Sequence, residues 1–224
     1  MTLLERPRPQ TKTGEWKRPH FFTTKKHPNE MKVYLTAGHT VINGKGTGVH
    51  SGTRDEAKEA AYLRDEIACY LERRNVTVIK DDVTTGFGRV MTWLNNTLTK
   101  SDTAIEIHFD ASGSGGPNGC TAFVPINPTS HEEDLGRRLC KAIFEAAHIK
   151  PRGSNKGVRD EGFTFHKRLR FLHSPAVATN VLLEVCFITS DSDWNKYITN
   201  RDSIALMLSN SIYNHLKDRH NGKA

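Results

Sequence analysis

One apolar run constrains the fold of this chain more than any other feature. The segment 180–187, NVLLEVCF, is apolar at nearly every position. A strand with one face in solvent alternates apolar and polar residues, whereas a strand covered on both faces does not. The run therefore predicts an interior strand of a parallel sheet that carries helices on both faces.

Strand-like and helix-like segments alternate from residue 31 onward. Strands are predicted over 32–37, 76–80, 103–110, 119–126 and 180–187, and helices over 53–74, 88–98, 130–148 and 202–216. Residues 150–167 read as a long basic loop and 169–172 as a short strand or turn. Pro125 favours an edge position for 119–126 because proline cannot donate a backbone hydrogen bond. This order predicts a single layered α/β domain, with a mostly parallel, twisted sheet flanked by helices.

Residues 1–30 differ from the rest of the chain. Four prolines and scattered basic residues interrupt this segment, and no helical or strand period survives in it. We predict a basic, proline-containing N-terminal arm over 1–30, followed by a folded domain over 31–224. The arm is either solvated or a surface that contacts cell wall or membrane through Trp16, Phe21 and Phe22.

The charge balance limits the classes of partner. There are 32 Lys and Arg residues against 25 Asp and Glu, a formal net charge of +7. Such a chain attracts acidic partners, and nucleic acid, anionic lipid and bacterial wall polymers all qualify. No run of eighteen apolar residues is present, so we expect no membrane span. The first residues, MTLLERPRPQ, lack the apolar stretch of a signal peptide, so we expect no secretory signal.

Glu184 interrupts the apolar run and is the most informative polar residue. An ionised carboxylate in such a strand is costly unless it meets a cation, a metal or a proton. One interpretation is a structural ion pair with an arginine such as Arg168 or Arg170. The other is a group that takes part in a reaction.

Three further polar residues stand where apolar ones are expected or where active sites form. Glu56 projects into the apolar stripe of the helix over 53–74, although Thr53-x-x-Glu56 also has the spacing of a capping box. His108 shares one strand face with Glu106 and Asp110, which is either a solvent-facing side or part of a site. His39 directly follows the first strand, at the sheet edge where open α/β folds gather ligands.

These residue types fit one kind of chemistry. Two neutral imidazoles and a carboxylate form a standard catalytic zinc set that leaves a position for water. The metal polarises a carbonyl and acidifies water, while a nearby glutamate accepts the proton. Four residues on four segments therefore fit the hydrolysis of an amide.

From Met31 to about Leu216 the chain resembles the zinc-dependent N-acetylmuramoyl-L-alanine amidases, especially the catalytic domains of phage endolysins. The resemblance rests on AGH (37–39), EIHFDAS (106–112) and VLLEVCFITSDSD (181–193), together with Glu56 and the apolar positions behind it. It identifies 31–224 as a zinc amidase catalytic domain that binds one zinc ion.

The resemblance also assigns roles to single residues. It implies that His39, Glu56 and His108 bind zinc and that Glu184 is the catalytic acid and base. It favours Glu56 over the capping-box interpretation and over Glu59, because only the pattern behind Glu56 keeps the register of the family.

The chain departs from the family at two places in these motifs. Thr36-Ala37-Gly38-His39 stands where many members have Asp-Pro-Gly-His, and Asp110 stands where many have Asn. Asp110 either orients His108 or binds substrate.

Three further residues are assigned with alternatives left open. Glu106 either supports the metal site or pairs with a lysine or arginine. Arg168 and Arg170 belong to a basic stretch that resembles the groove wall of the family. They either hold carboxylates of the substrate peptide or are solvated.

The expected reaction is hydrolysis of the amide between N-acetylmuramic acid and L-alanine, with peptidoglycan as partner and no nucleic acid. We expect a phage lysin made in the host cytoplasm, which reaches the wall after holin-type release or as part of a virion. A zinc peptidase acting within the stem peptide is the nearest alternative. A basic nucleic-acid-binding or virion structural protein without catalysis is the second.

Overall fold

The computed structural model describes residues 31–113, 116–173 and 179–222. Its secondary structure, in chain order, is β1 (Lys32–Ala37), β2 (Val41–Ile42), β3 (Lys45–Gly46), β4 (His50–Ser51), β5 (Arg54–Asp55), α1 (Glu56–Glu72), β6 (Thr77–Lys80), α2 (Phe87–Thr97), β7 (Thr103–Asp110), β8 (Thr121–Val124), α3 (Ser130–Ala147), β9 (Val158–Asp160), the 3₁₀ helices η1 (Glu161–Phe163) and η2 (Arg170–His173), β10 (Thr179–Phe187) and α4 (Asp191–His220).

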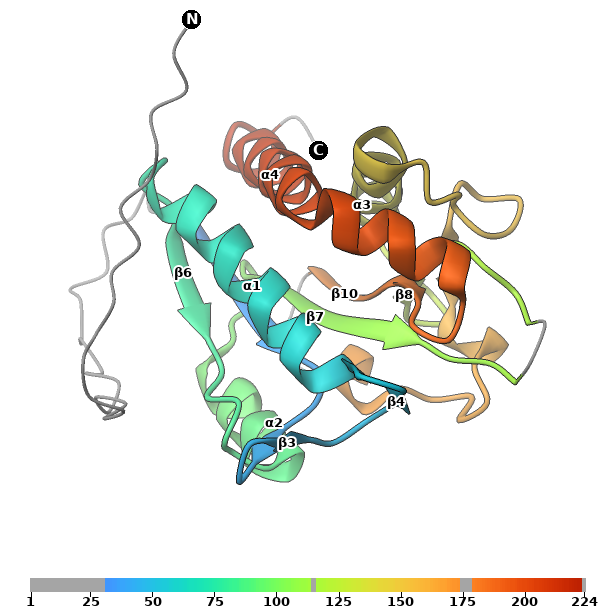
Figure 1. Cartoon of the computed structure of the whole chain (residues 1–224). Coiled ribbons are helices and arrows are strands. Elements are labelled where there is room, and N and C mark those ends of the chain that lie inside the picture. Colours follow the sequence, from blue (N-terminus) through green and yellow to red (C-terminus); the bar gives the residue numbers. More distant parts are fainter. Residues whose placement is uncertain (1–30, 114–115, 174–178, 223–224) are drawn as a thin grey trace, which may run out of the picture.

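A six-stranded sheet in the order β6-β1-β7-β10-β8-β9 organises the molecule (Figure 1). β6, β1, β7 and β10 run parallel, and β8 is antiparallel to β10 and parallel to β9. The apolar run forms β10, which lies inside the sheet between β7 and β8. The predicted α/β class, with a mostly parallel sheet flanked by helices, is confirmed.

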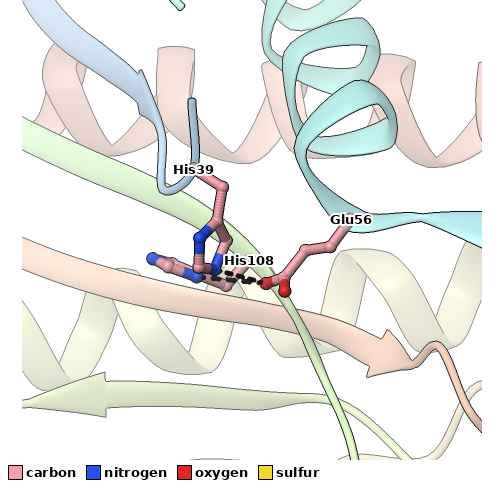
Figure 2. A group of neighbouring side chains, drawn as sticks. All are labelled: His39, Glu56 and His108. Atoms are coloured by element: carbon pink, nitrogen blue, oxygen red, sulfur yellow. Dashed lines mark hydrogen bonds and ion pairs between the residues drawn. The ribbon is translucent and has the colours of Figure 1, made fainter. Parts of the chain in front are cut away.

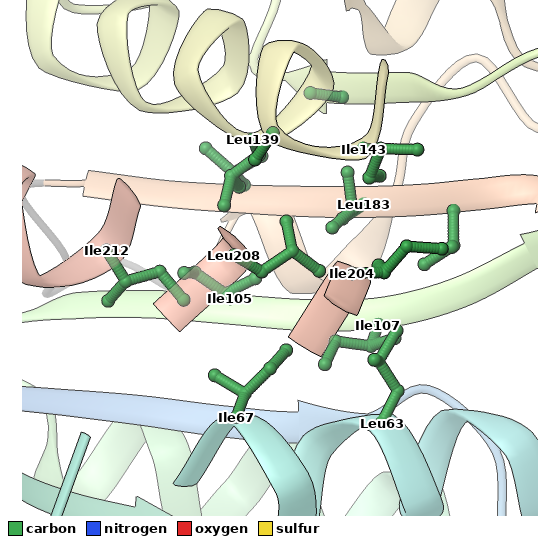
Figure 3. Close-up of a cluster of buried hydrophobic side chains, with 14 of the residues drawn as sticks. Leu63, Ile67, Ile105, Ile107, Leu139, Ile143, Leu183, Ile204, Leu208 and Ile212 are labelled. Atoms are coloured by element: carbon green, nitrogen blue, oxygen red, sulfur yellow. The ribbon is translucent and has the colours of Figure 1, made fainter. Parts of the chain in front are cut away.

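Helices cover both faces of the sheet. Helices α1, α3 and α4 pack on one face, where they form a large apolar core with alternate residues of β1, β7 and β10. Leu63 of α1, Ile107 of β7, Leu183 of β10 and Leu208 of α4 meet in this core (Figure 3). The other face carries α2 and η2 over a smaller cluster that includes Tyr34, Ala104 and Leu182.

This division between the two faces decides where the polar strand residues point. Along a strand, successive side chains alternate between faces. Ile105 and Ile107 of β7 enter the large core, whereas Ala104 belongs to the smaller cluster. His108 and Glu106 therefore lie on the face of α2 and η2, and so does Glu184 of β10, which follows Leu182 by two residues.

Helix α1 begins later than the sequence predicts. It starts at Glu56, and its N-cap is Asp55, whose side chain accepts a hydrogen bond from the Lys58 amide at 3.2 Å. The capping box based on Thr53 is therefore wrong. The chain before Glu56 instead forms the short hairpin of β4 and β5, which directs the chain into the helix.

Helix α4 begins earlier than predicted, at residue 191 rather than 202. Its first turns do pack, because Tyr197 is fully buried and Asp193 is 2% exposed. The Asp193 carboxylate accepts hydrogen bonds from the amides of Gly119 and Phe187. The sequence does not indicate these first turns, because their apolar positions are sparse and an aspartate such as Asp193 is normally a surface residue.

The structure also settles two predictions about the segments around β8 and η2. The edge position predicted for 119–126 is taken by β9, a short strand inside the expected basic loop, which pairs with the outer side of β8. The segment 169–172, predicted as a short strand or turn, is not a strand: Leu169 directly precedes the 3₁₀ helix η2, which runs from Arg170 to His173. Short strands such as β9 follow from pairing with a neighbour, which local sequence does not reveal.

Within the described residues, no helix is long and apolar enough to cross a membrane. Helix α4 has 30 residues, but charged side chains occur along it. The arm predicted over 1–30, with Trp16, Phe21 and Phe22, lies outside the described residues.

A buried histidine joins α3 to α4. His215 is fully buried, with Nδ1 at 3.2 Å from Asp134 Oδ2, while its Nε2 has no hydrogen-bond partner. Burial lowers the pKa of His215 to about 4, although Asp134 opposes this shift. The neutral imidazole is therefore the form that the folded chain favours.

We predict that His215 makes the fold less stable in mild acid. Since its pKa is near 6.5 in the unfolded chain and about 4 in the fold, its contribution is complete above pH 6.5 and is lost as the pH falls towards 4. The loss is about 3 kcal/mol. Urea unfolding at pH 4 to 8 should show the difference in stability between wild type and His215→Gln shrinking by that amount. A difference that stays constant with pH would contradict the prediction.

Candidate metal centre

His39, Glu56 and His108 converge at the carboxyl edge of the sheet (Figure 2). His39 follows β1, Glu56 opens α1 and His108 is near the end of β7. Glu56 Oε1 lies 3.2 Å from His39 Nε2 and 3.2 Å from His108 Nδ1, and one ligand atom from each of the three residues fits within 4.8 Å. Segments separated in sequence thus bring together three side chains that could hold a metal ion.

The Glu56 carboxylate is fixed by the backbone around it. Its Oε1 accepts a hydrogen bond from the Phe109 amide at 3.0 Å, and Oε2 accepts one from the Val49 amide at 2.9 Å. The residue is 2% exposed and stands at the start of α1, where the helix dipole favours a negative charge. The carboxylate is therefore already oriented by the fold itself.

Two glycines leave room for the imidazole rings. A Cβ on Gly38 would lie 1.8 Å from His108 Nε2, so no side chain fits there. A Cβ on Gly48 would lie 2.6 Å from Glu56 Oε2 and 2.7 Å from the His39 ring, and Gly48 also has a φ of +89°. The rings themselves meet edge to face, with centroids 4.9 Å apart.

The charged forms of Glu56 and His108 stabilise each other. Burial raises the pKa of Glu56, but hydrogen bonds with His108 and His39 outweigh it and hold that pKa well below its usual range. Burial lowers the pKa of His108, but Glu106 and Glu56 outweigh it and hold the pKa well above its usual range. An ionised carboxylate at Glu56 is thus the state that the surroundings favour.

Glu184 lies beside this group on the neighbouring strand. In the pairing of β10 with β7 it stands opposite His108, and its Oε2 is buried without a hydrogen-bond partner. Burial raises its pKa to about 8; His108 lowers it, and the nearby carboxylates of Asp110 and Glu56 add to the rise. No ion pair joins it to Arg168 or Arg170, all of them described residues, so that structural alternative is wrong.

Glu106 and Asp110 flank His108 on the same strand face. Glu106 is 2% exposed, with Oε2 at 3.3 Å from His108 Nε2, a distance typical of an ion pair although the angle is not that of a good hydrogen bond. Asp110 Oδ2 accepts a hydrogen bond from Arg152 Nη1 at 3.1 Å. Glu106 therefore contacts a candidate ligand, whereas Asp110 is bound to an arginine.

The remaining candidates lie away from the three ligands. Glu59 accepts a hydrogen bond from the Tyr197 hydroxyl at 3.0 Å and so faces α4. Arg168 and Arg170 line a pocket between η2 and α2. Within the described part of the chain, no hydrogen bond or ion pair joins these arginines to His39, Glu56 or His108.

These three side chains suit a small divalent cation. Zinc binds imidazole nitrogen and carboxylate oxygen at about 2.0–2.2 Å, so neighbouring ligands of a tetrahedral ion lie about 3.3 Å apart. The two observed distances of 3.2 Å match this edge. Because Glu56, Glu106 and Glu184 surround the two imidazoles, a cation would also relieve the repulsion among buried carboxylates.

The chain matches the N-acetylmuramoyl-L-alanine amidase family over residues 33–217. The chain belongs to this family. Membership supports peptidoglycan amidase activity. The matched residues include the whole sheet except the first residue of β1. No curated protein sequence matches the chain significantly.

Solved structures of similar proteins agree with the family. An inferred N-acetylmuramoyl-L-alanine amidase from Neisseria meningitidis is 26% identical, with a TM-score of 0.66 over 84% of this chain and 96% of that one. The catalytic domain of the CD27L endolysin, which targets Clostridia difficile, is 21% identical, with a TM-score of 0.63 over 83% of this chain and 98% of that one. An amidase from Clostridium difficile 630 is 17% identical, with a TM-score of 0.67 over 88% and 100%. The last two likenesses concern the fold.

Several residues that support the candidate metal centre were not predicted from the sequence. Gly48 lies in a glycine-rich loop whose glycines look alike in sequence. A buried ion pair joins Arg64 to Asp81, whose Oδ1 also accepts the Ala37 amide at 3.1 Å and so fixes the backbone just before His39. In the sequence, only the position of Arg64 on the apolar face of α1 could have indicated this buried ion pair.

We predict that Gly38→Ala disrupts the candidate metal centre. The new methyl group would overlap the His108 ring, which must move away from Glu56. Gly88→Ala is the matched control, since a Cβ there meets nothing within 4 Å. Metal titration should show affinity for zinc at least about tenfold weaker in Gly38→Ala and unchanged in Gly88→Ala. Equal affinities would contradict the prediction.

Proposed function

We propose that the chain is a zinc-dependent enzyme that hydrolyses the amide between N-acetylmuramic acid and L-alanine in peptidoglycan. The observation that carries this proposal is the position of Glu184. Its buried, unpartnered carboxylate oxygen lies on β10, opposite His108 and near enough to Glu56 for their charges to interact. A buried carboxylate oxygen without a partner is costly in a purely structural role, whereas a group that handles a proton needs a free oxygen.

In this proposal His39, Glu56 and His108 hold one zinc ion. When bound, zinc supplies a Lewis acid that polarises a carbonyl and acidifies water. Glu184 accepts a proton from the attacking water at its free carboxylate oxygen and then donates that proton to the nitrogen of the leaving L-alanine. Its raised pKa reflects a pocket in which the protonated form of the carboxyl is tolerated.

Glu106 acts in this proposal as a positioning residue. Its carboxylate faces His108 Nε2, so it favours a proton on that nitrogen and leaves Nδ1 free for the metal. Thr36, which replaces the aspartate common in the first motif of the family, pairs in register with Glu106 across β1 and β7. At this point of the sheet the acidic side chain is therefore Glu106 of β7, rather than an aspartate on β1.

The nearest alternative is a zinc peptidase that cuts within the stem peptide, because it would use the same ligands. The family match over 33–217 favours the amidase. Digestion of purified sacculi followed by analysis of new amino termini separates the two. The amidase releases peptides that begin with L-alanine and leaves muramic acid without a peptide.

The nucleic-acid-binding alternative rests on the net charge of +7 and on the basic arm predicted over 1–30. It requires neither zinc nor Glu184, so the same variants test it. For the biological setting we propose a phage lysin that reaches the wall after holin-type release or within a virion. The likeness to the CD27L endolysin domain supports this setting.

We predict that Glu184→Gln abolishes hydrolysis and keeps zinc. The amide has nearly the shape of the carboxyl but cannot take up the proton, so the clearing rate of purified sacculi should fall by at least about 100-fold. Metal analysis should still find one zinc per chain. A variant that clears at the wild-type rate would refute the proposed role.

The metal requirement has its own test. His39→Ala and chelator treatment should each remove both zinc and clearing, and added zinc should restore only the chelated wild type. His50→Ala is the matched control, because His50 is an exposed histidine that contacts the Gly46 carbonyl rather than the centre. Clearing that survives the chelator would rule out zinc dependence.

We predict that Glu106→Gln weakens zinc binding without unfolding the chain. Loss of the charge behind a histidine ligand lowers metal affinity by about 10- to 100-fold. Competition with a chromogenic chelator measures the affinity, and ¹⁵N NMR of the His108 ring reports which nitrogen carries the proton. Unchanged affinity and an unchanged tautomer would show that Glu106 only fills space.

A further inference from the structure

A basic pocket opens on the same face of the sheet as the candidate metal centre. It has a volume of about 300 Å³ and is lined by Met91 and Asn95 of α2 and by Arg168, Arg170 and His173 at η2. None of these lining residues is acidic. Within the described part of the chain, no carboxylate forms an ion pair with Arg168 or Arg170, so both guanidinium groups are available to an anion.

The basic wall of this pocket is held in place by a buried glutamate. Glu161 is fully buried; its Oε1 lies 2.6 Å from His173 Nε2, and its Oε2 accepts a hydrogen bond from the Leu169 amide. Leu169 stands between the two arginines, so Glu161 fixes the backbone that carries them. Because a buried carboxylate is costly unless it is fully bonded, this arrangement ties the loop down at both ends.

A second tie connects η2 to the central sheet. The Asn180 side chain on β10 donates hydrogen bonds to the carbonyls of Phe171 and Leu172, and both of these residues are buried against the smaller core cluster. The arginines are therefore mounted on a supported element rather than on a loose loop. Preorganised donors of this kind bind carboxylates with less loss of entropy.

The distance from the metal centre suits a short peptide. Asn180, which holds η2, and Glu184 lie on the same face of β10, where four residues, about 13 Å, separate them. An extended peptide of about four residues spans the same length. A stem peptide whose first amide lies at the centre can therefore bring a later carboxylate to the pocket.

We propose that the pocket binds a carboxylate of the peptidoglycan stem peptide, through Arg168 and Arg170, beyond the bond that is cut. This inference rests on the proposed function and adds a determinant of substrate choice to it. Arginine presents paired N–H groups that match the two oxygens of a carboxylate. The surface thereby selects acidic stems over stems whose carboxylates are amidated.

The stem peptide itself provides the test, because as a reaction product it is bound but not cut. Calorimetry compares a stem tetrapeptide with free carboxylates and the same peptide with its carboxylates converted to primary amides. We expect the full-length wild type to bind the acidic peptide roughly tenfold or more tightly than the amidated one. Arg168→Gln/Arg170→Gln should bind both peptides equally weakly.

Lys141→Gln/Lys217→Gln is the matched control, because it removes two positive charges from exposed positions on α3 and α4. It should bind the acidic peptide as the wild type does. Circular dichroism and thermal unfolding verify that each variant is folded, which we expect since the arginines are exposed.

The outcomes separate this inference from the proposed function. The inference is overturned if the arginine variant binds the acidic peptide like the wild type, or if the wild type shows no measurable binding. Clearing of sacculi by the wild type would leave the amidase proposal standing in either case. Failure of the wild type to release peptides beginning with L-alanine would instead overturn the amidase proposal.

Discussion

The arrangement of this protein depends on one buried carboxylate, that of Glu56. It accepts backbone hydrogen bonds from Val49 and Phe109, and it meets the imidazoles of His39 and His108. Burying a charge in a protein interior is unfavourable unless partners surround it. Here the partners come from the segment after β1, from the glycine-rich loop and from β7, so the cost of burial is offset only when these three segments and α1 are in place. The candidate metal centre is therefore also a structural junction.

Much of the fold follows from the sequence because its main signals are local. The apolar run of β10 marks an interior strand, and the spacing of apolar residues marks the helices. The strand β9 and the first turns of α4 were missed because pairing with β8, and the hydrogen bonds of Asp193, come from residues distant in the chain. Local sequence does not record such contacts.

Part of the candidate site could also be predicted from local features of the sequence. His108 and Glu184 stand out because each puts a polar group into a strand that the core needs. Whether they meet could not be read from either strand alone, since this depends on the pairing of β7 with β10. The ion pair of Arg64 with Asp81, behind the site, and that of Glu161 with His173, at the basic pocket, could not be predicted, because the sequence does not show which partner each residue meets. They appear only when the chain is folded.

Strand pairing also bears on how such an enzyme forms and fails. β10 and β7 are in register up to the pair of Glu184 with His108, and the register shifts before Phe187. A slip of one residue would turn Glu184 towards the helices α1, α3 and α4 and place an apolar side chain beside the imidazoles. The same slip would expose the large core, so a misaligned sheet would be unstable as well as inactive. A chain that folds stably therefore also has a correctly assembled centre, and partly active misfolded forms should not accumulate.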